Sequence, residues 1–263
     1  MKILVIGSWK SGTSILYTSV LKSLTKHIGH FEPGPNHGAL NSLEFHQNLT
    51  KNVNCVVKSL FWGNTDSHEN LGELFSLYDK VVFIYRDPRD WIISTFFYSF
   101  YRNHPPEWKS GFDMAYNNTK QKERNPNAHP FHKLHSKCEV ENISKIYNPL
   151  ISLFKVFGGR NVYFLKYEDF VDKDIASLEN YLGFTLNQNI SVDSSIRRVE
   201  RTKSYNNWKQ WYNNDDVNHY KPVIEKYLME LGYSNDWELE TPTELDSTYG
   251  SKYMYNLHNN KNI

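Results

Sequence analysis

Hydrophobic residues along this chain form short, nearly continuous runs that alternate with helical patterns. Four apolar runs predict strands, at Lys2–Ile6, Asn54–Lys58, Lys80–Tyr85 and Asn161–Lys166. The Val and Ile content of the second and third runs is typical of parallel strands that are covered on both faces. Apolar residues at helical spacing predict helices at Thr13–Lys26, Pro88–Arg102, Ala176–Leu182 and Val217–Leu231. This alternation predicts an α/β fold in which helices flank an open parallel sheet.

The polar segments predict one domain with two peripheral parts. Residues 1–235 carry the strands and helices of the predicted domain. Residues 105–138 are rich in His, Asn and Lys and have no clean period, which predicts an insertion or lid over the carboxyl edge of the sheet. Asn187–Arg201 is predicted to be a mobile loop, and residues 236–263 a polar, weakly structured C-terminal tail.

Composition excludes several classes of protein. The 263 residues have a formal net charge of +1, which argues against general binding of nucleic acid. The two cysteines, Cys55 and Cys138, do not make a disulfide framework. No apolar stretch is long enough to cross a bilayer, and the opening apolar run is too short for a secretory signal. The sequence therefore predicts a cytoplasmic protein without stable membrane insertion.

A glycine-rich turn follows the first predicted strand. Gly7 and Gly12 have the G-x-x-x-x-G spacing of a strand–loop–helix that holds phosphate with backbone N–H groups and a positive helix end. A Walker A loop carries lysine directly after the second glycine, where this chain has Thr13, and its only loop lysine is Lys10. No apolar strand ends in the aspartate of a metal-binding Walker B element. The loop therefore favours a shorter anhydride, held by lysine and arginine rather than by Mg²⁺.

A second group of polar residues follows the third predicted strand. Arg86 ends that strand, where open α/β sheets bind their ligands. Asp87 and Pro88 predict the N-cap and the first position of the next helix. Ser94 lies about two turns further on, near enough to the helix start to share an anion with Arg86. The alternative is a surface ion pair between Arg86 and Asp90, with Ser94 merely exposed.

Five segments resemble, in family order, the motifs of the PAPS-dependent sulfotransferases. WKSGTS resembles the 5′-phosphosulfate loop PKSGTT, with Trp9 in place of the usual proline. YRDPRDWIIS resembles the 3′-phosphate motif, whose arginine and serine lie eight residues apart, as Arg86 and Ser94 do. Arg201–Tyr212 resembles a degraded RKG-x-x-GDWKN motif, while LKYEDF and YLMELGY resemble a strand-end segment and the closing helix.

The resemblance implies an enzyme that moves a sulfuryl group from 3′-phosphoadenosine-5′-phosphosulfate (PAPS) to an acceptor hydroxyl or amine, with no metal. The donor-binding residues that it implies are Lys10, Ser11, Gly12, Thr13, Ser14, Arg86, Ser94, Tyr167, Arg201 and Lys203. Transfer is expected to be in line, with Lys10 stabilising the charge that grows on the bridging oxygen. The alternative for Arg201 is a solvated charge in a mobile loop, and for Tyr167 a core aromatic at a strand end.

The general base is less clearly marked. Cytosolic family members use a histidine in a Lys-x-His segment after the second strand, where this chain has Leu60. HFEPGPN resembles instead the carbohydrate-modifying branches, which implies Glu32 as base and a carbohydrate or glycolipid as acceptor. Lys58 is expected as a second positive group near the sulfuryl. The alternative is that Glu32 caps a turn or pairs with a nearby lysine. Three fallback bases follow in sequence, namely His37, Glu44 and His46.

Other features leave alternatives open. His129, His132 and His135 recur at three-residue spacing, but without a cysteine or acid in register they favour a solvated lid or acceptor contacts over zinc. The aromatics of Phe96–Tyr101 and Trp108 are expected either to stack on a sugar face or lipid, or to lie in the core. The competing functions are a P-loop nucleotide kinase or NTPase, and a non-catalytic module that binds nucleotide or glycan.

Overall fold

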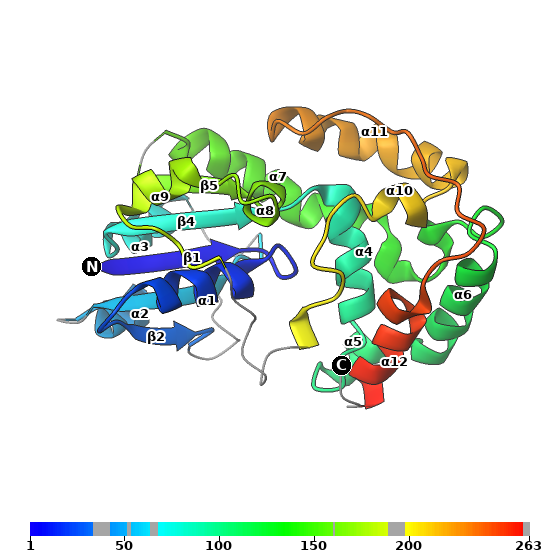
Figure 1. Cartoon of the computed structure of the whole chain (residues 1–263), viewed down its shortest axis with the longest axis horizontal. Coiled ribbons are helices and arrows are strands. Elements are labelled where there is room, and N and C mark those ends of the chain that lie inside the picture. Colours follow the sequence, from blue (N-terminus) through cyan, green and yellow to red (C-terminus); the bar gives the residue numbers. More distant parts are fainter. Residues whose placement is uncertain (34–42, 52–53, 64–67, 160, 189–197, 260–263) are drawn as a thin grey trace. The chain divides into compact units, whose positions relative to one another are not determined.

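The described part of the chain forms two compact units (Figure 1). The computed structural model describes residues 1–33, 43–51, 54–63, 68–159, 161–188 and 198–259. Unit 1 comprises Met1–Arg86 and Ile146–Ser194, and unit 2 comprises Asp87–Lys145 and Ser195–Ile263.

Unit 1 contains a parallel sheet, whose described strands follow the order β2-β3-β1-β4-β5. The strands are β1 (Lys2–Gly7), β2 (Ile28–Phe31), β3 (Cys55–Leu60), β4 (Lys80–Tyr85) and β5 (Val162–Lys166). β1, β3 and β4 are buried along almost their whole length, whereas the edge strand β2 is partly exposed. Burial on both faces explains why the three central strands are continuous apolar runs in the sequence.

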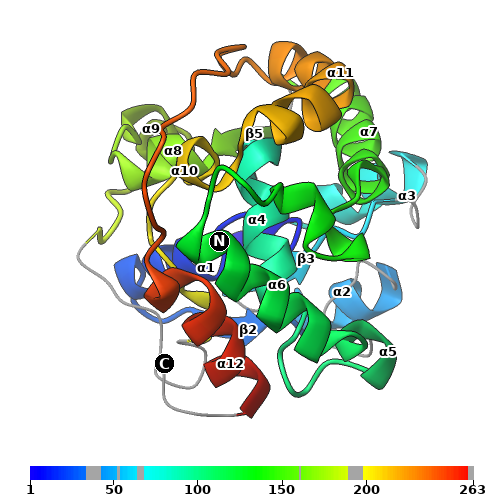
Figure 2. The same cartoon turned by 90° about the vertical axis from the view of Figure 1, so that its right-hand side faces the viewer.

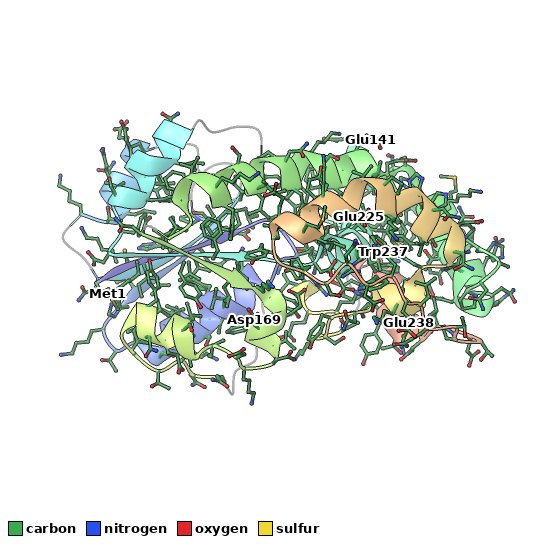
Figure 3. The ribbon with its side chains drawn as sticks, turned by 90° about the horizontal axis from the view of Figure 1, so that it is seen from above. Met1, Glu141, Asp169, Glu225, Trp237 and Glu238 are labelled. Carbon is green, nitrogen blue, oxygen red and sulfur yellow. The ribbon has the colours of Figure 1, made fainter. Side chains whose placement is uncertain are left out.

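Helices cover both faces of this sheet. They are α1 (Thr13–Ser23), α2 (Leu43–Leu49), α3 (His68–Ser76), α8 (Tyr167–Val171), α9 (Ala176–Leu182) and the second part of α7 (Val140–Phe157). Figure 3 shows α1 and α9 on one face and α3 with α7 on the other. Aromatic contacts hold α7 against its neighbours. Phe157 of α7 packs on Phe75 of α3 with ring centroids 5.2 Å apart, and Phe154 of α7 packs on Phe164 of β5 at 5.0 Å. The predicted α/β class with a parallel sheet flanked by helices is confirmed.

Unit 2 is helical. Its helices are α4 (Pro88–Tyr98), α5 (Pro106–Lys109), α6 (Phe112–Arg124), the start of α7, α10 (Trp208–Trp211), α11 (Asn214–Glu230) and α12 (Ser251–Asn259). Short 3₁₀ turns form at η1 (Phe131–Lys133), η2 (Ser136–Cys138) and η4 (Ser247–Tyr249). Helix α4 is the centre of the core, because it contacts α10, α11 and α12 and buries Trp91, Phe96 and Phe97 completely. Figure 2 shows α4 between these helices.

A buried carboxylate organises the polar part of unit 2. Asp216 is fully buried and accepts hydrogen bonds from the backbone N–H groups of Phe131, His132 and Asn213 at 2.8, 2.8 and 3.0 Å. It also accepts from the His132 ring at 2.7 Å and lies 3.9 Å from the Lys122 ammonium. These donors satisfy the charge and tie the start of α11 to η1.

Several elements were not predicted from the sequence. Strand β2 and helices α2, α3 and α7 were missed, and α6 lies within the segment 105–138 that shows no clean period. The expectation of weak structure in residues 236–263 was wrong at α12, where Tyr253, Met254 and Leu257 are buried. Residues 189–197 of the predicted mobile loop lie outside the described part. The domain boundaries, including the insertion at 105–138, remain predictions.

None of the described helices is both long and apolar enough to cross a membrane. The cytoplasmic location remains a prediction from the sequence.

Candidate functional site

The phosphate loop of unit 1 is a tight turn between β1 and α1. The Ser11 hydroxyl donates to the Ser8 carbonyl at 2.6 Å, and the Ser11 N–H donates to the same oxygen at 3.3 Å. Lys10 and Gly12 have positive φ values of 63° and 98°. Helix α1 has neither a side-chain cap nor an acidic residue in its first described turn, so its N-terminal N–H groups face the loop with their partial positive charge.

Two side chains from distant parts of the sequence complete this loop within unit 1. The Tyr167 ring, at the start of α8, lies so close to Gly12 that a Cβ there would meet it at 2.5 Å. The Arg86 guanidinium lies 4.5 Å from the centre of the Tyr167 ring, and it reaches the Lys10 carbonyl at 3.5 Å. The Tyr147 hydroxyl donates to the Arg86 carbonyl at 2.6 Å. The structure thus brings together Lys10, Gly12, Arg86 and Tyr167, as the sequence predicted for part of an anion site.

Glu32 and Lys58 form an ion pair at the ends of β2 and β3. The Lys58 ammonium donates to a Glu32 carboxylate oxygen, and the Glu32 N–H donates to the Lys58 carbonyl at 3.0 Å. The Lys58 side chain is 1% exposed and Glu32 22% exposed, so the carboxylate is the member of the pair that solvent or an acceptor can reach. The Phe31 ring lies 4.5 Å from the same ammonium. The alternative in which Glu32 pairs with a nearby lysine is therefore realised, and its role as base remains a prediction.

In unit 2, the start of α4 has the predicted cap. The Asp87 carboxylate accepts from the Arg89 N–H at 2.8 Å, and Pro88 occupies the first turn. The alternative that made Asp90 a surface residue was wrong, because Asp90 is fully buried. Its carboxylate accepts from the N–H groups of Asn206 and Trp208 at 2.5 and 3.1 Å, which holds the segment Arg201–Tyr212 against α4. Sequence reasoning missed this role.

Stacking between a guanidinium and two indole rings also holds the segment Arg201–Tyr212 in place. The Arg89 guanidinium lies 4.1 Å from the centre of the buried Trp208 ring and 5.2 Å from that of Trp237, which Figure 3 labels. Asp87 pairs with this guanidinium at 2.6 Å. The sequence DPRD gave no signal for this arrangement, since arginine and aspartate are mostly exposed in folded proteins and are buried only when paired.

The remaining predicted donor residues of unit 2 have distinct surroundings. Ser94 is 2% exposed, so the expectation that it is merely exposed was wrong. Arg201 donates to the Tyr249 carbonyl at 3.0 Å, and its guanidinium lies 5.4 Å from the centre of the Phe97 ring, which excludes a fully solvated charge. The Lys203 side chain is 62% exposed and pairs with Glu200 at 2.9 Å. Donor binding by these three residues remains a prediction.

Comparison with known proteins agrees with this geometry. The family model for the sulfotransferase domain matches residues 1–258. The chain belongs to the sulfotransferase family. Among curated proteins the comparison found no match.

Three solved structures are similar to this sulfotransferase at low sequence identity. A mouse sulfotransferase complexed with PAP is 12% identical, covers 89% of this chain and 89% of its own, and has a TM-score of 0.55. A retinol dehydratase in complex with androsterone and PAP is 15% identical, covers 92% and 82%, and has a TM-score of 0.49. A sulfotransferase from Alicyclobacillus acidocaldarius is 12% identical, covers 88% and 96%, and has a TM-score of 0.45.

The fallback bases of the sulfotransferase lie in different environments. Glu44 is exposed on α2. His46, on the same helix, is 2% exposed and shares a 2.6 Å hydrogen bond with the Tyr78 hydroxyl. Burial lowers the pKa of His46 to about 4, so its imidazole is neutral near pH 7 and a weak proton acceptor. His37 lies outside the described residues.

The histidines of the segment 105–138 have structural partners. His132 bonds to Asp216 and stacks on His219 with ring centroids 4.2 Å apart. His135 caps η2 by accepting from the Lys137 N–H at 3.1 Å. These contacts account for the positions of both residues in the fold.

The aromatic residues near the end of α4 divide into two groups. Phe96, Phe97 and Phe100 are completely buried and belong to the core. The second group is partly exposed and forms a chain of ring contacts at 5.1–5.8 Å, made by Tyr98, Tyr101, His104 and Trp108. We call these four residues the α4 aromatic cluster. The expectation of a core position is therefore confirmed for Phe96, Phe97 and Phe100, whereas stacking of the exposed rings on a sugar face or lipid remains a prediction.

Proposed function

We propose that this sulfotransferase moves the sulfuryl group of PAPS to an acceptor hydroxyl or amine. The single observation that carries the proposal is the arrangement of Lys10 and Arg86. Lys10 lies inside the turn rather than after Gly12, and Arg86 reaches its carbonyl from the end of β4. A lysine in the turn suits a phosphosulfate anhydride better than the outer phosphates of a triphosphate.

The roles of the individual residues follow from charge. The N–H groups of Gly12, Thr13 and Ser14 are proposed to bind the 5′-phosphate, as helix N-termini bind anions. Ser11, whose N–H and hydroxyl both donate to the Ser8 carbonyl, is proposed to hold the turn in shape. Arg86 is proposed to bind the 3′-phosphate, and Tyr167 to position Arg86. Ser94, Arg201 and Lys203 are proposed as donor-binding residues of unit 2. Lys10 is proposed to stabilise the bridging oxygen as negative charge grows on it.

In the transfer itself, one S–O bond replaces another. The acceptor oxygen attacks sulfur, the bond from sulfur to the bridging oxygen breaks, and adenosine 3′,5′-bisphosphate leaves. The acceptor proton is proposed to pass to the Glu32 carboxylate, which Lys58 holds in place. The buried ammonium of Lys58 fixes the direction of the partly exposed carboxylate, which supports this assignment.

The acceptor is proposed to be a hydroxyl of a carbohydrate or glycolipid. The α4 aromatic cluster supports this, because flat aromatic rings bind the CH face of a sugar while their polar tips bond to its hydroxyls. In this cluster the Tyr101 hydroxyl accepts from the Asn103 amide at 2.9 Å, and the Arg198 guanidinium lies 5.0 Å from the centre of the Tyr101 ring.

The proposed function is tested by donor binding and turnover on the full chain. Calorimetry is expected to show that adenosine 3′,5′-bisphosphate binds much more tightly than ATP. Incubation with ³⁵S-labelled PAPS and a panel of saccharides and glycolipids is then expected to yield labelled acceptor and one bisphosphate per transfer. Equal affinity for the two nucleotides, or magnesium-dependent hydrolysis of ATP, would favour a P-loop NTPase instead.

A further inference from the structure

A cavity lies between two helices of unit 2, and none of its lining residues is among those assigned to the donor. Helices α6 and α12 pack side by side in Figures 1 and 2. The groove between them encloses about 410 Å³ and is lined by Tyr116, Lys120, Glu123, Arg124, Glu244, Leu245, Ser247, Ser251, Lys252 and Tyr255. This volume falls in the range of small-molecule sites. Leu245 is the only lining residue with a purely apolar side chain, so the cavity suits a polar ligand.

The floor of the cavity is rigid. The Glu123 carboxylate, which is 6% exposed, accepts from the N–H of Ser251 at 2.5 Å and from its hydroxyl at 2.6 Å. The Glu123 carbonyl accepts from the Leu245 N–H at 2.8 Å. Gly250 allows this close approach, because a Cβ there would overlap the Glu123 carboxylate. Burial raises the pKa of Glu123, while the hydrogen bonds from Ser251 lower it.

The rim carries an excess of positive charge. Lys120, Arg124 and Lys252 outnumber the two carboxylates among the lining residues, which are the exposed Glu244 and the buried Glu123. Within the described residues, none of the three cations forms a salt bridge. The whole chain has a net charge of only +1, so this excess is local. Such convergence of cations on a cavity is typical of a site for an anion.

Helix stability explains only part of this charge. Arg124 ends α6, where a cation interacts favourably with the helix dipole. Lys252 is the second residue of α12, whose first turn has no acidic residue. A cation in the first turn opposes the dipole, so Lys252 weakens α12 slightly. Its position is therefore better explained by a ligand than by the fold.

Two tyrosines give the cavity a surface for ring stacking. The rings of Tyr116 and Tyr255 are 5.7 Å apart between centroids and tilted by 38°. This separation is too small for a planar ring to fit between them, so a ligand must lie across both rings. The Lys120 ammonium lies 5.4 Å from the centre of the Tyr116 ring, which places a cation beside this surface. A pyranose with a charged substituent matches the hydroxyl, aromatic and cationic groups together.

We propose that this cavity binds an anionic saccharide, namely a pyranose that carries a sulfate or carboxylate group. Lys120 and Lys252 bind the anionic group, and Tyr116 and Tyr255 contact the sugar ring. Use of the cavity to hold the acidic part of an acceptor chain rests on the proposed function. The binding itself does not, since the cavity shares no residue with the phosphate loop.

Saturation-transfer NMR on the full chain without donor tests the proposal. The observed probes are N-acetylglucosamine 6-sulfate and N-acetylglucosamine, and inorganic sulfate, which has no protons of its own, is measured as a competitor of the sulfated sugar. The sulfated sugar is expected to bind at least about tenfold more tightly than either of the other two. Lys120→Ala and Lys252→Ala are each expected to weaken it about tenfold, and Tyr255→Ala to weaken the sulfated and plain sugars equally. Both lysines are at the rim, so these two variants are expected to keep the wild-type melting temperature even if Tyr255→Ala does not fold.

The matched control is Lys226→Ala. Lys226 is an exposed lysine on α11 whose ammonium lies 4.6 Å from the centre of the Tyr227 ring, outside the cavity. This variant is expected to bind the sulfated sugar as the wild type does. The proposal is overturned if Lys226→Ala lowers binding as much as Lys120→Ala does, if both sugars bind equally, or if inorganic sulfate alone binds. It is also overturned if adenosine 3′,5′-bisphosphate competes for the cavity. Failure of turnover with intact sugar binding would instead contradict the proposed function.

Discussion

The ion pair of Glu32 and Lys58 gives the sharpest test of the proposed base, because it couples catalysis to stability. Glu32→Gln removes both the proton acceptor and the charge that faces a buried ammonium. A loss of turnover in this variant alone is therefore ambiguous. The variant Glu32→Gln/Lys58→Met separates the two effects, because methionine fills the space of lysine without its charge.

The size of the stability effect follows from burial. Removing one partner of a fully buried ion pair costs about 3–5 kcal/mol. Lys58 is 1% exposed but Glu32 is 22% exposed, so water can partly replace the carboxylate. We expect Glu32→Gln to lower the free energy of unfolding by about 2–3 kcal/mol. The double variant is expected to lie within about 1 kcal/mol of the wild type, since replacing a whole buried pair by apolar groups is often neutral.

Catalysis is expected to respond differently from stability. Glu32→Gln should lower single-turnover transfer by about a hundredfold or more, and affinity for adenosine 3′,5′-bisphosphate should hardly change. The double variant should regain stability in urea unfolding but not turnover. Recovery of turnover in the double variant would show that Glu32 acts only on the fold. Unchanged turnover in Glu32→Gln would assign the base to another group, and Glu44→Gln, His37→Ala and His46→Ala would then identify it.

Four further predictions follow from the contacts described. Arg86→Ala should weaken binding of 3′-phosphorylated adenosine nucleotides by about 1.5–3 kcal/mol in calorimetry, and unchanged discrimination against plain nucleotides would refute the assignment. Lys10→Ala should lower the single-turnover rate by about a hundredfold and affinity for the bisphosphate product much less; an unchanged rate would exclude Lys10 as the group that stabilises the leaving oxygen. Burial lowers the folded pKa of His46 to about 4, below the value of 6.5 for an exposed histidine, so the unfolded chain binds the extra proton first. The contribution of neutral, buried His46 to the free energy of unfolding is therefore complete above pH 6.5 and falls by about 1.4 kcal/mol per pH unit down to about pH 4. Urea unfolding at a series of pH values should show this slope for the wild type and not for His46→Gln. Asp216→Asn should lower the free energy of unfolding by about 3–5 kcal/mol, because the fully buried carboxylate serves four N–H donors; a loss below 1 kcal/mol would contradict that role.

The sheet could be predicted from the sequence because its central strands are buried on both faces. β1, β3 and β4 therefore appear as continuous apolar runs, and the predicted bounds of β4 match those observed. β2 gave no such signal, since it is a partly exposed edge strand of four residues with Gly29 and His30 at its centre. Helix α7 was missed although an internal proline is no bar to prediction, since α11 contains Pro222 and was predicted.

Helix α6 shows a different limit of hydrophobic patterns. Its buried residues are Ala115, Thr119, Lys122 and Glu123, so the face that packs inward is polar. Lys122 is satisfied by the Pro126 carbonyl at 2.6 Å and Glu123 by Ser251. Both partners lie outside α6, and one is 128 residues away. Periodicity of apolar residues cannot reveal a helix whose burial depends on specific hydrogen bonds with distant segments.

In the candidate site, too, the residues that are close in sequence could be predicted, and the contacts between distant segments could not. The loop could be predicted because its glycines, lysine and hydroxyl residues are consecutive, and the chemistry of an anion site is visible in their spacing. The Glu32–Lys58 pair was only one of two alternatives, since the sequence does not show that β2 lies beside β3.

The contact of Tyr167 with both Gly12 and Arg86 joins the two parts of the predicted anion site that lie in unit 1. Gly12 is required twice, once by its φ of 98° and once because the Tyr167 ring occupies the space of a side chain. The same ring supports the Arg86 guanidinium, which in turn reaches the Lys10 carbonyl. A larger residue at position 12 would therefore displace Tyr167 and, with it, the support of Arg86. The loop and the strand-end arginine consequently form one rigid assembly, in which the group predicted to bind the 3′-phosphate depends on the packing of the loop predicted to bind the 5′-phosphate.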